Sequence, residues 1–286
     1  MSAAVLLGLI AAVGYGISDY LWKHAGHAVG LWRSIFYGNL FGLVLLTTLA
    51  LLTHEPAAHG SAPAVAWLWA VGAAFILLAG AVTFTQAMIK GTLAVVSPVA
   101  ASYGAVAALL SLATGEHLQG RSWAGISVTV CGVCLVSAPA NAGAELRQHL
   151  RSSGAVWALG AACCYGSGFW LQGRLAVPAL GPLLPVWTCY AIITVAVGFV
   201  ARRQVLAPIA PVAVRTIVLS SALFVLGYLA LTWGFATGHI AVVVVLSTLG
   251  SAVTVLLARV LDRAHIATHQ WLALGVIILG LVLIRS

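Results

Sequence analysis

The chain has 286 residues, of which 62% are hydrophobic and only 6% are charged. Because a soluble domain carries roughly 25% charged residues, this composition excludes a soluble globular protein and indicates one that lies in a lipid bilayer. The net charge of +8 does not indicate nucleic-acid binding, since the Lys and Arg residues are scattered over the connecting segments and form no patch.

Ten apolar runs predict ten transmembrane helices, because each approaches the roughly 20 residues that a helix needs to cross a bilayer. The runs are continuous and rich in Ala and Leu, which favours helices over the alternating strands of a membrane barrel. The first run has no basic segment before it and is too long for a signal peptide, so we interpret it as a retained helix. The predicted helices are residues 3–22, 29–52, 64–88, 93–114, 120–138, 154–175, 183–200, 212–236, 240–261 and 268–284.

The two halves of the chain repeat one pattern. Phe84–Leu110 matches Leu231–Leu257 at an offset of 147, with Ala-Val-Val in both segments, and the Tyr15-Gly16 pair returns as Tyr165-Gly166 at an offset of 150. We therefore predict two five-helix repeats, residues 1–139 and 154–286, joined by a linker at 140–153. An odd number of helices per repeat makes the second repeat inverted, and the site of a transporter built this way lies between the repeats, in a central cavity.

The basic residues also predict an orientation. Of the thirteen Lys and Arg residues, ten lie in the odd-numbered connecting segments and three in the even-numbered segments or at the termini. Cytoplasmic segments are enriched in Lys and Arg, so we expect the odd-numbered segments in the cytoplasm and both termini on the other side.

The first helix carries a polar stripe. Tyr15, Ser18, Asp19 and Trp22 are spaced so that they share one helix face. A charge at bilayer depth costs free energy and usually faces an aqueous cavity, which makes Asp19 a candidate ligand for a substrate amine, a gate residue or a proton acceptor. The alternative is an interfacial ion pair with Lys23, four residues further on.

The later helices contribute further candidates. Gln86 and Lys90 share a face of the third helix, although Lys90 has the alternative role of a snorkelling anchor. Pro98 bends the fourth helix and frees backbone groups that are tolerated only against protein or a water-filled cavity. We expect the substrate-binding residues to be Tyr15, Ser18, Gln86, Ser97, Tyr103, Tyr165, Trp233 and Ser247, and the gate residues to be Asp19, Trp22, Lys90, Gln172 and His239.

Other kinds of chemistry find no support in the sequence. The five cysteines all fall within apolar runs, and Cys131-x-x-Cys134 has no second pair, so we expect neither disulfides nor a metal site. There is no His-Glu-x-x-His or Gly-x-Ser-x-Gly motif and no glycine-rich phosphate loop. We therefore expect no enzyme activity, no cofactor and no ATP-driven pumping.

The whole pattern resembles a known family. The two five-helix halves, the Tyr-Gly pair in the first helix of each, the Ala-Val-Val start of the fourth and ninth helices and Gly115-Glu116 are similar to EamA-type members of the drug/metabolite transporter superfamily. Within it, the segment Ser18–Trp22 is similar to the YddG-like amino-acid exporters. The second half departs from the pattern, with Leu261-Asp262 at the Gly-Glu position.

This resemblance implies a function and a setting. It implies a secondary transporter, a ten-helix basket in the bacterial cytoplasmic membrane that works as a monomer and exports amino acids, including aromatic and apolar ones, by alternating access. Its expected partners are a small-molecule substrate and the lipid bilayer, without nucleic acid. Export of drug-like cations or other small metabolites is the alternative.

Overall fold

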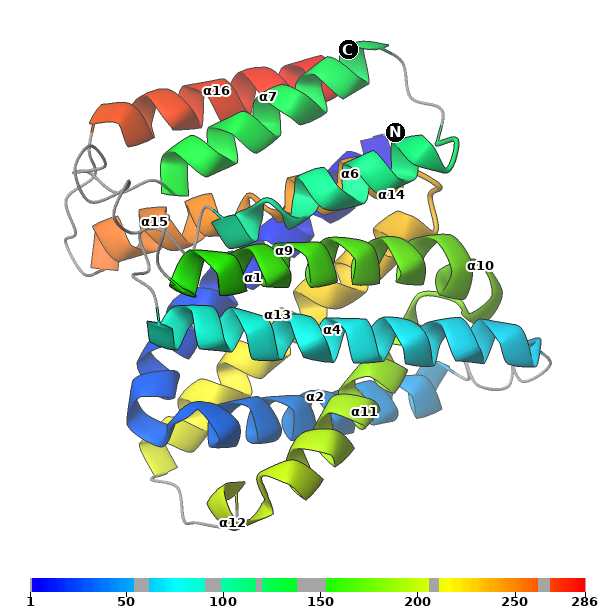
Figure 1. Ribbon diagram of the computed structural model, residues 1–286, viewed down its shortest axis with the longest axis vertical. Coiled ribbons are helices and arrows are strands. Elements are labelled where there is room, and N and C mark those ends of the chain that lie inside the picture. The colour runs from blue at the N-terminus through cyan, green and yellow to red at the C-terminus, as the bar shows by residue number, and fades with distance from the viewer. Residues whose placement is uncertain are drawn as a thin grey trace.

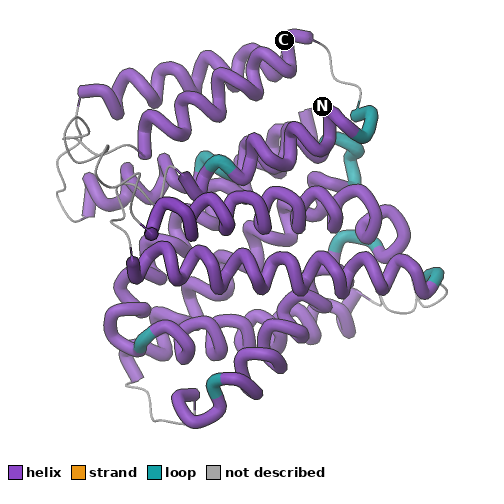
Figure 2. Tube along the Cα trace, in the orientation of Figure 1, coloured by secondary structure: helices purple, strands orange, loops and turns teal. Residues whose placement is uncertain are grey.

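The computed structural model describes residues 2–53, 62–90, 99–116, 120–137, 153–205, 211–261 and 268–285, which are helical nearly throughout and contain no strand (Figures 1 and 2). The elements in chain order are α1 (Ser2–Val29), α2 (Leu31–Thr53), α4 (Ala64–Lys90), α6 (Tyr103–Ala113), α7 (Gly120–Ser137), α9 (Ser153–Leu171), the π-helical turn η1 (Gln172–Ala176), α10 (Val177–Leu180), α11 (Leu183–Val200), α12 (Arg202–Val205), α13 (Pro211–Phe235), α14 (Ile240–Ser247), α15 (Gly250–Leu261) and α16 (Thr268–Arg285).

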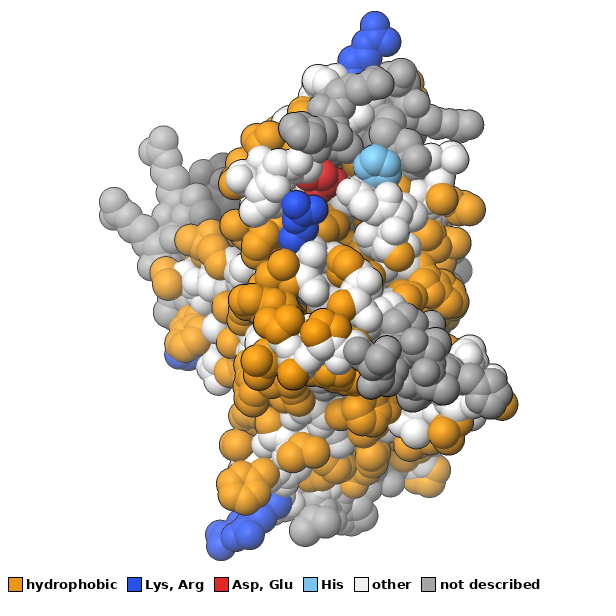
Figure 3. All heavy atoms as spheres, turned by 90° about the vertical axis from the view of Figure 1, so that its right-hand side faces the viewer, with side chains coloured by type: hydrophobic (Ala, Val, Ile, Leu, Met, Phe, Trp, Pro, Cys, Tyr) orange, Lys and Arg blue, Asp and Glu red, His pale blue; other side chains and the backbone are white. Residues whose placement is uncertain are grey.

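Five of these helices are long and apolar enough to cross a membrane. The spans are Ser2–Trp22, Trp32–Thr53, Ala64–Phe84, Leu183–Val200 and Pro211–Phe235, and two shorter apolar helices occupy Val99–Ala113 and Ile240–Thr254. Large apolar side chains cover much of the outer surface, as Figure 3 shows for one face. The expected all-helical, multi-pass membrane fold is therefore confirmed, whereas ten spans and an inverted second repeat stay predictions.

The core of the bundle is built from antiparallel helix pairs that approach closely at glycines. Gly14 of α1 lies against Gly227 of α13, and Ser18, one turn further along α1, bonds to Ser220, which lies earlier in α13. In the same way α4 packs antiparallel against α9, where Tyr165 lies against Gly80. Small residues let helix backbones approach in a membrane, where van der Waals packing drives helix association.

Helices α7 and α16 form a separate antiparallel pair at one end of the molecule (Figure 1). Gly132 of α7 lies against Ile277 of α16, and Gly280 lies against Thr129. The remaining helices enclose the main hydrophobic core, whose aromatic side chains form the candidate site.

Candidate functional site

Aromatic side chains from six helices meet inside the bundle. Tyr165 and Phe169 of α9 are stacked with their ring centroids 6.1 Å apart, and Phe169 meets Tyr228 edge-on at 5.7 Å. These separations fall in the range in which aromatic pairs attract each other beyond simple burial. We call the connected set the aromatic cluster; its members are Tyr15, Phe84, Tyr103, Tyr165, Phe169, Tyr190, Phe224 and Tyr228.

Three of the predicted binding residues come together at one corner of this cluster. The hydroxyl of Tyr103 lies 3.1 Å from Ser247 Oγ, which connects α6 to α14, and the Tyr103 and Tyr165 rings have their centroids 6.3 Å apart. Both tyrosines are only partly buried. This corner therefore combines aromatic faces with hydroxyl groups and retains accessible surface.

Asp19 lies on the inward side of α1 and is nevertheless exposed. The outward side of α1 carries the exposed Leu6, Ile10 and Val13, whereas Ala12 and Tyr15, seven and four residues before Asp19, are buried. Residues at these spacings share a helix face. Asp19 is thus exposed on the face that α1 turns toward the other helices, opposite its outward apolar stripe.

The surroundings of Asp19 belong to the aromatic cluster. Its charge acts on the hydroxyl groups of Tyr15, Tyr103 and Tyr165. The Tyr15 hydroxyl is buried without a hydrogen-bond partner in the structure. A carboxylate, an unpaired hydroxyl and aromatic faces therefore belong to one region of the bundle.

Gln172, a predicted gate residue, is fully buried behind the cluster. Its Oε1 accepts a hydrogen bond of 3.0 Å from the Tyr228 hydroxyl, while its Nε2 has no partner. Gln172 begins the π-helical turn η1, and such turns are frequent at functional sites. The side chain thus links η1 to α13 beside the aromatic cluster.

The segment that follows α6 is hydrogen-bonded to elements from the second half of the chain. Both carboxylate oxygens of Glu116 accept from the backbone N–H of Ala241, at 3.3 and 3.2 Å, at the start of α14. Trp170 Nε1 donates to Thr114 Oγ1 at 3.3 Å, and Arg174 donates to the Thr114 carbonyl at 3.4 Å. We call these contacts the Glu116 closure.

The charges of this closure gather on one face of the molecule. An acidic, a basic and a histidine side chain lie together in Figure 3, in agreement with the interactions of Glu116 with Arg174 and His239. Desolvation raises the pKa of Glu116 above its ordinary value, although the hydrogen bond from Ala241 and the charges of His239 and Arg174 act in the opposite direction. His239, a predicted gate residue, therefore lies beside the closure.

Several predicted residues have other surroundings. Ser18 is buried and bonds to the Ser220 carbonyl and hydroxyl at 2.9 Å, which is a contact between α1 and α13. The Trp22 ring lies over Gly38 of α2. Lys90 is exposed, with its ammonium 4.9 Å from the centre of the Trp157 ring.

Two further predicted residues, Trp233 and Gln86, do not join the aromatic cluster. Trp233 is 47% exposed and continues the outward stripe of Leu219 and Leu226 at seven-residue spacing. Gln86 is half-buried without a recorded hydrogen bond, and Ser97 lies outside the described residues. The binding roles of these residues stay predictions.

Sequence reasoning did not select several residues that the structure brings together. Five aromatic residues of the cluster were not among the predicted site residues, because a ring in a largely apolar helix does not show by itself whether it faces lipid or the core; they are Phe84, Phe169, Tyr190, Phe224 and Tyr228. The sequence did draw attention to Glu116, because the Gly115-Glu116 pair is part of the family resemblance. Among the described residues, no three His, Cys, Asp or Glu side chains form a group that could hold a metal ion.

Comparisons with known proteins identify a similar fold and, for about half of the sequence, a similar family. A solved structure titled "Crystal structure of protein" superimposes with a TM-score of 0.75 over 99% of this chain and 96% of its own, at 18% sequence identity, which shows a shared fold. No curated protein matches the sequence. The model of the EamA-like transporter family matches residues 2–138, so the first half of the chain, just under half of its length, is similar to the EamA-like membrane transporters.

Proposed function

We propose that the protein is a secondary transporter of the drug/metabolite transporter superfamily that exports amino acids from the cytoplasm by alternating access. The observation that carries this proposal is the accessible carboxylate of Asp19 on the inward face of α1, beside the aromatic cluster. The match of residues 2–138 to the EamA-like family supports the same conclusion.

The groups around Asp19 suit the parts of an amino acid. The carboxylate offers an ion pair to the substrate ammonium, and the faces of Tyr103 and Tyr165 attract cations as well as apolar side chains. The Tyr15 hydroxyl, which is buried without a partner in this conformation, would donate to the substrate carboxylate once the surrounding helices move apart. A site with few directional groups and wide aromatic surface would accept many side chains.

The two ends of the site differ in accessibility, as alternating access requires. On one side Asp19 is exposed, whereas on the other side Gln172 is fully buried and the Glu116 closure joins α6 to α9 and α14. We propose that this conformation is open toward the arginine-rich, cytoplasmic side. Substrate would enter there, and opening of the Glu116 closure would release it.

Export of drug-like cations is the second candidate, and Asp19 itself favours it. Asp19 and Glu116 are the sole acidic residues among those that the structure describes, and Asp19 alone lies on an inward membrane face. A fixed negative charge attracts any organic cation, with or without a carboxylate. The candidates therefore differ in whether the transported molecule must be an amino acid.

Counterflow in liposomes separates the two candidates. We expect purified protein to exchange labelled apolar, aromatic and hydroxyl amino acids well above empty vesicles, because the proposed site has both an ammonium ligand and aromatic surface. Tyr165→Ala should lower the exchange at least tenfold. Phe75→Ala, which removes an exposed ring from the outer side of α4, is the matched control and should leave it unchanged. Exchange of a lipophilic cation without any amino acid would replace the first candidate by the second.

A further inference from the structure

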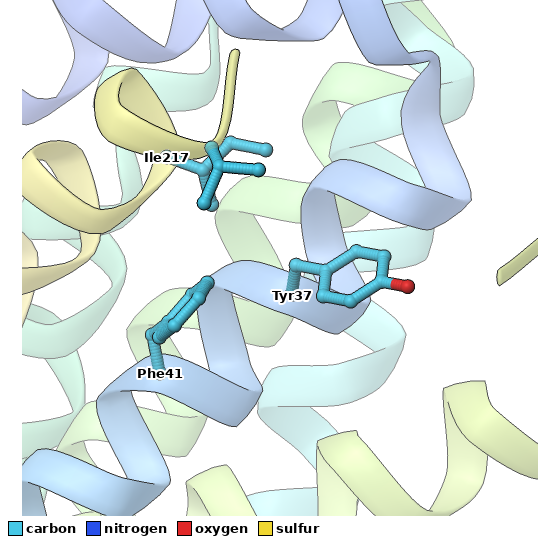
Figure 4. A pocket seen from close by; sticks show the side chains of 4 residues that line it. Tyr37, Phe41 and Ile217 are labelled. Carbon is cyan, nitrogen blue, oxygen red and sulfur yellow. The ribbon is translucent and has the colours of Figure 1, made fainter. Parts of the chain in front are cut away.

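A groove opens on the outer surface of the bundle between α2 and α13. In the sequence, its lining residues are far from those that α9 contributes to the aromatic cluster. It has a volume of about 230 Å³ and is lined by Tyr37, Phe41, Val214 and Ile217. Figure 4 shows the Tyr37 and Phe41 side chains on one wall and Ile217 on the other. The lining is apolar except for the tyrosine hydroxyl at one edge.

The position of the groove along the two helices places it near one membrane surface. Ser221 Oγ donates to the Gly38 carbonyl at 2.6 Å, and four residues further along both helices Val225 lies against Gly42, so α2 and α13 run parallel. Their membrane spans therefore begin at the same surface, at Trp32 and Pro211. At about 1.5 Å per residue, the lining residues lie within roughly 15 Å of that surface, in a single leaflet.

Arginines surround the surface end of the groove. Arg33, one turn before Tyr37 on α2, donates through Nε to the Gln204 carbonyl at 2.8 Å, and the Tyr37 hydroxyl donates to the Val205 carbonyl at 3.0 Å. These bonds hold the single turn α12 against α2. The same turn carries Arg202 and Arg203, both exposed.

The elements that carry this cluster contain no acidic side chain. No Asp or Glu occurs in α2, α12 or α13, and Arg33 donates to a neutral carbonyl; the nearest acidic residue on a described neighbouring helix is Asp19 of α1. Arg215, exposed on the outward side of α13, adds a fourth guanidinium near the same surface to the half-buried Arg33 and the exposed Arg202 and Arg203. Guanidinium groups pair with phosphate through two parallel hydrogen bonds, and basic pockets between membrane helices suit anionic headgroups.

We propose that this groove binds an anionic phospholipid, with one acyl chain between Tyr37, Phe41 and Ile217 and the headgroup phosphate held by Arg33, Arg202 and Arg203. The apolar lining matches an acyl chain at that depth, and the excess of arginines over acidic side chains favours an anionic over a zwitterionic headgroup. A bound lipid would join α12, α2 and α13, and α13 in turn packs against α1, which carries Asp19.

Lipid binding to the purified full-length protein in detergent tests the proposal. Native mass spectrometry would measure the affinity for phosphatidylglycerol and for phosphatidylcholine with identical acyl chains. We expect at least tenfold tighter binding of phosphatidylglycerol, because its headgroup adds a net negative charge at the arginines. Arg202→Gln together with Arg203→Gln should remove most of this preference. Arg121→Gln, an exposed arginine at the start of α7, is the control for general loss of charge and should retain it.

Two further measurements distinguish the groove from a general attraction of charge. Phe41→Trp, which fills the groove and leaves every arginine in place, should weaken phosphatidylglycerol binding at least fivefold, while the melting temperature without lipid shows whether the variant is folded. Soluble glycerol phosphate should compete poorly, because it lacks the acyl chain. Equal binding of the two lipids, or an unchanged preference in the arginine double variant, would overturn the proposal. Full competition by glycerol phosphate would show that the groove takes no part.

Discussion

At the residue scale, Asp19 has an uncommon position for a charge in a membrane helix. It lies three residues before the end of its span, on the face that also buries Ala12 and Tyr15, and it remains exposed. A carboxylate on the lipid side would cost a few kcal/mol, whereas one in an aqueous space keeps its hydration until a cation replaces it. The sequence left open an ion pair with Lys23, whose side chain lies outside the described part of the structure.

The role of Asp19 is tested by removing its charge. We expect Asp19→Asn to lower amino-acid counterflow at least tenfold, equivalent to about 1.4 kcal/mol of binding free energy, because the amide cannot form an ion pair with the substrate ammonium. Binding of an N-acetylated amino acid, which has no ammonium, should be the same in both proteins. If Asp19→Asn and the wild type show equal amino-acid counterflow, Asp19 is an interfacial residue and the substrate ammonium is bound elsewhere.

Sequence analysis could select only part of the site at this scale. Tyr15, Tyr103 and Tyr165 were recognisable because each stands beside Gly or Ser in a segment repeated between the halves. Tyr190 and Phe224 were not recognisable as site residues, since the sequence of an apolar helix does not show whether a ring faces lipid or the core. Trp233 shows the converse: it stands between the buried Thr232 and Gly234, but the helix turns its side chain outward.

At the scale of the elements, the sequence predicts helices better than their interruptions. Residues 240–261 were expected to form one helix, but α14 ends at Ser247 and α15 begins at Gly250. The Ser247 hydroxyl bonds to the Val244 carbonyl at 2.7 Å, and such side chains compete with the helical backbone. Likewise, Pro178 has no N–H to donate to the Arg174 carbonyl, and the wider turn η1 precedes it.

The contact between the Glu116 carboxylate and the N-terminus of α14 makes the closed conformation depend on pH. A negative carboxylate at a helix N-terminus is favourable, but its partial burial disfavours the charge, and the net effect raises the pKa of Glu116 in the closed conformation. When the closure opens, solvent returns the pKa toward its ordinary value. The closed conformation therefore binds the proton more tightly, and closure is favoured as the pH falls from the raised pKa toward that ordinary value.

Cross-linking across the closure measures this dependence. In a variant without the five native cysteines, cysteines at Thr114 and Trp170 should be joined by a short bifunctional reagent more completely at mildly acidic pH than at pH 8. Glu116→Gln, an uncharged equivalent of the protonated acid, should favour closure at both pH values. Because the reactivity of the thiols itself depends on pH, Glu116→Gln and its parent are compared at the same pH. A pH dependence that persists in Glu116→Gln would assign it to another group.

At the scale of the whole molecule, contacts recur with the offsets that the sequence repeats show. Gly16 of α1 lies against Gly250 and Val253, and Gly166 of α9 lies against Tyr103 and Val106. Adding 150 to the first helix and subtracting 147 from its partners converts one set of contacts into the other. The first predicted helix of each half thus packs against the fourth predicted helix of the opposite half, as expected if the two halves are repeats of one pattern.

The same offsets predict where the second closure lies. The Glu116 closure joins Thr114 to Trp170, and the equivalent positions are Leu261 and Tyr20, at the end of α15 and on α1 near Asp19. If the halves exchange roles during transport, cysteines at Tyr20 and Leu261 should cross-link in the opposite conformation, while those at Thr114 and Trp170 cross-link in this one. Each cross-link should abolish counterflow because it holds one side shut, and saturating substrate should shift their ratio, which gel mobility would measure. A protein carrying both cross-links at once and still transporting would exclude alternation between these two closures.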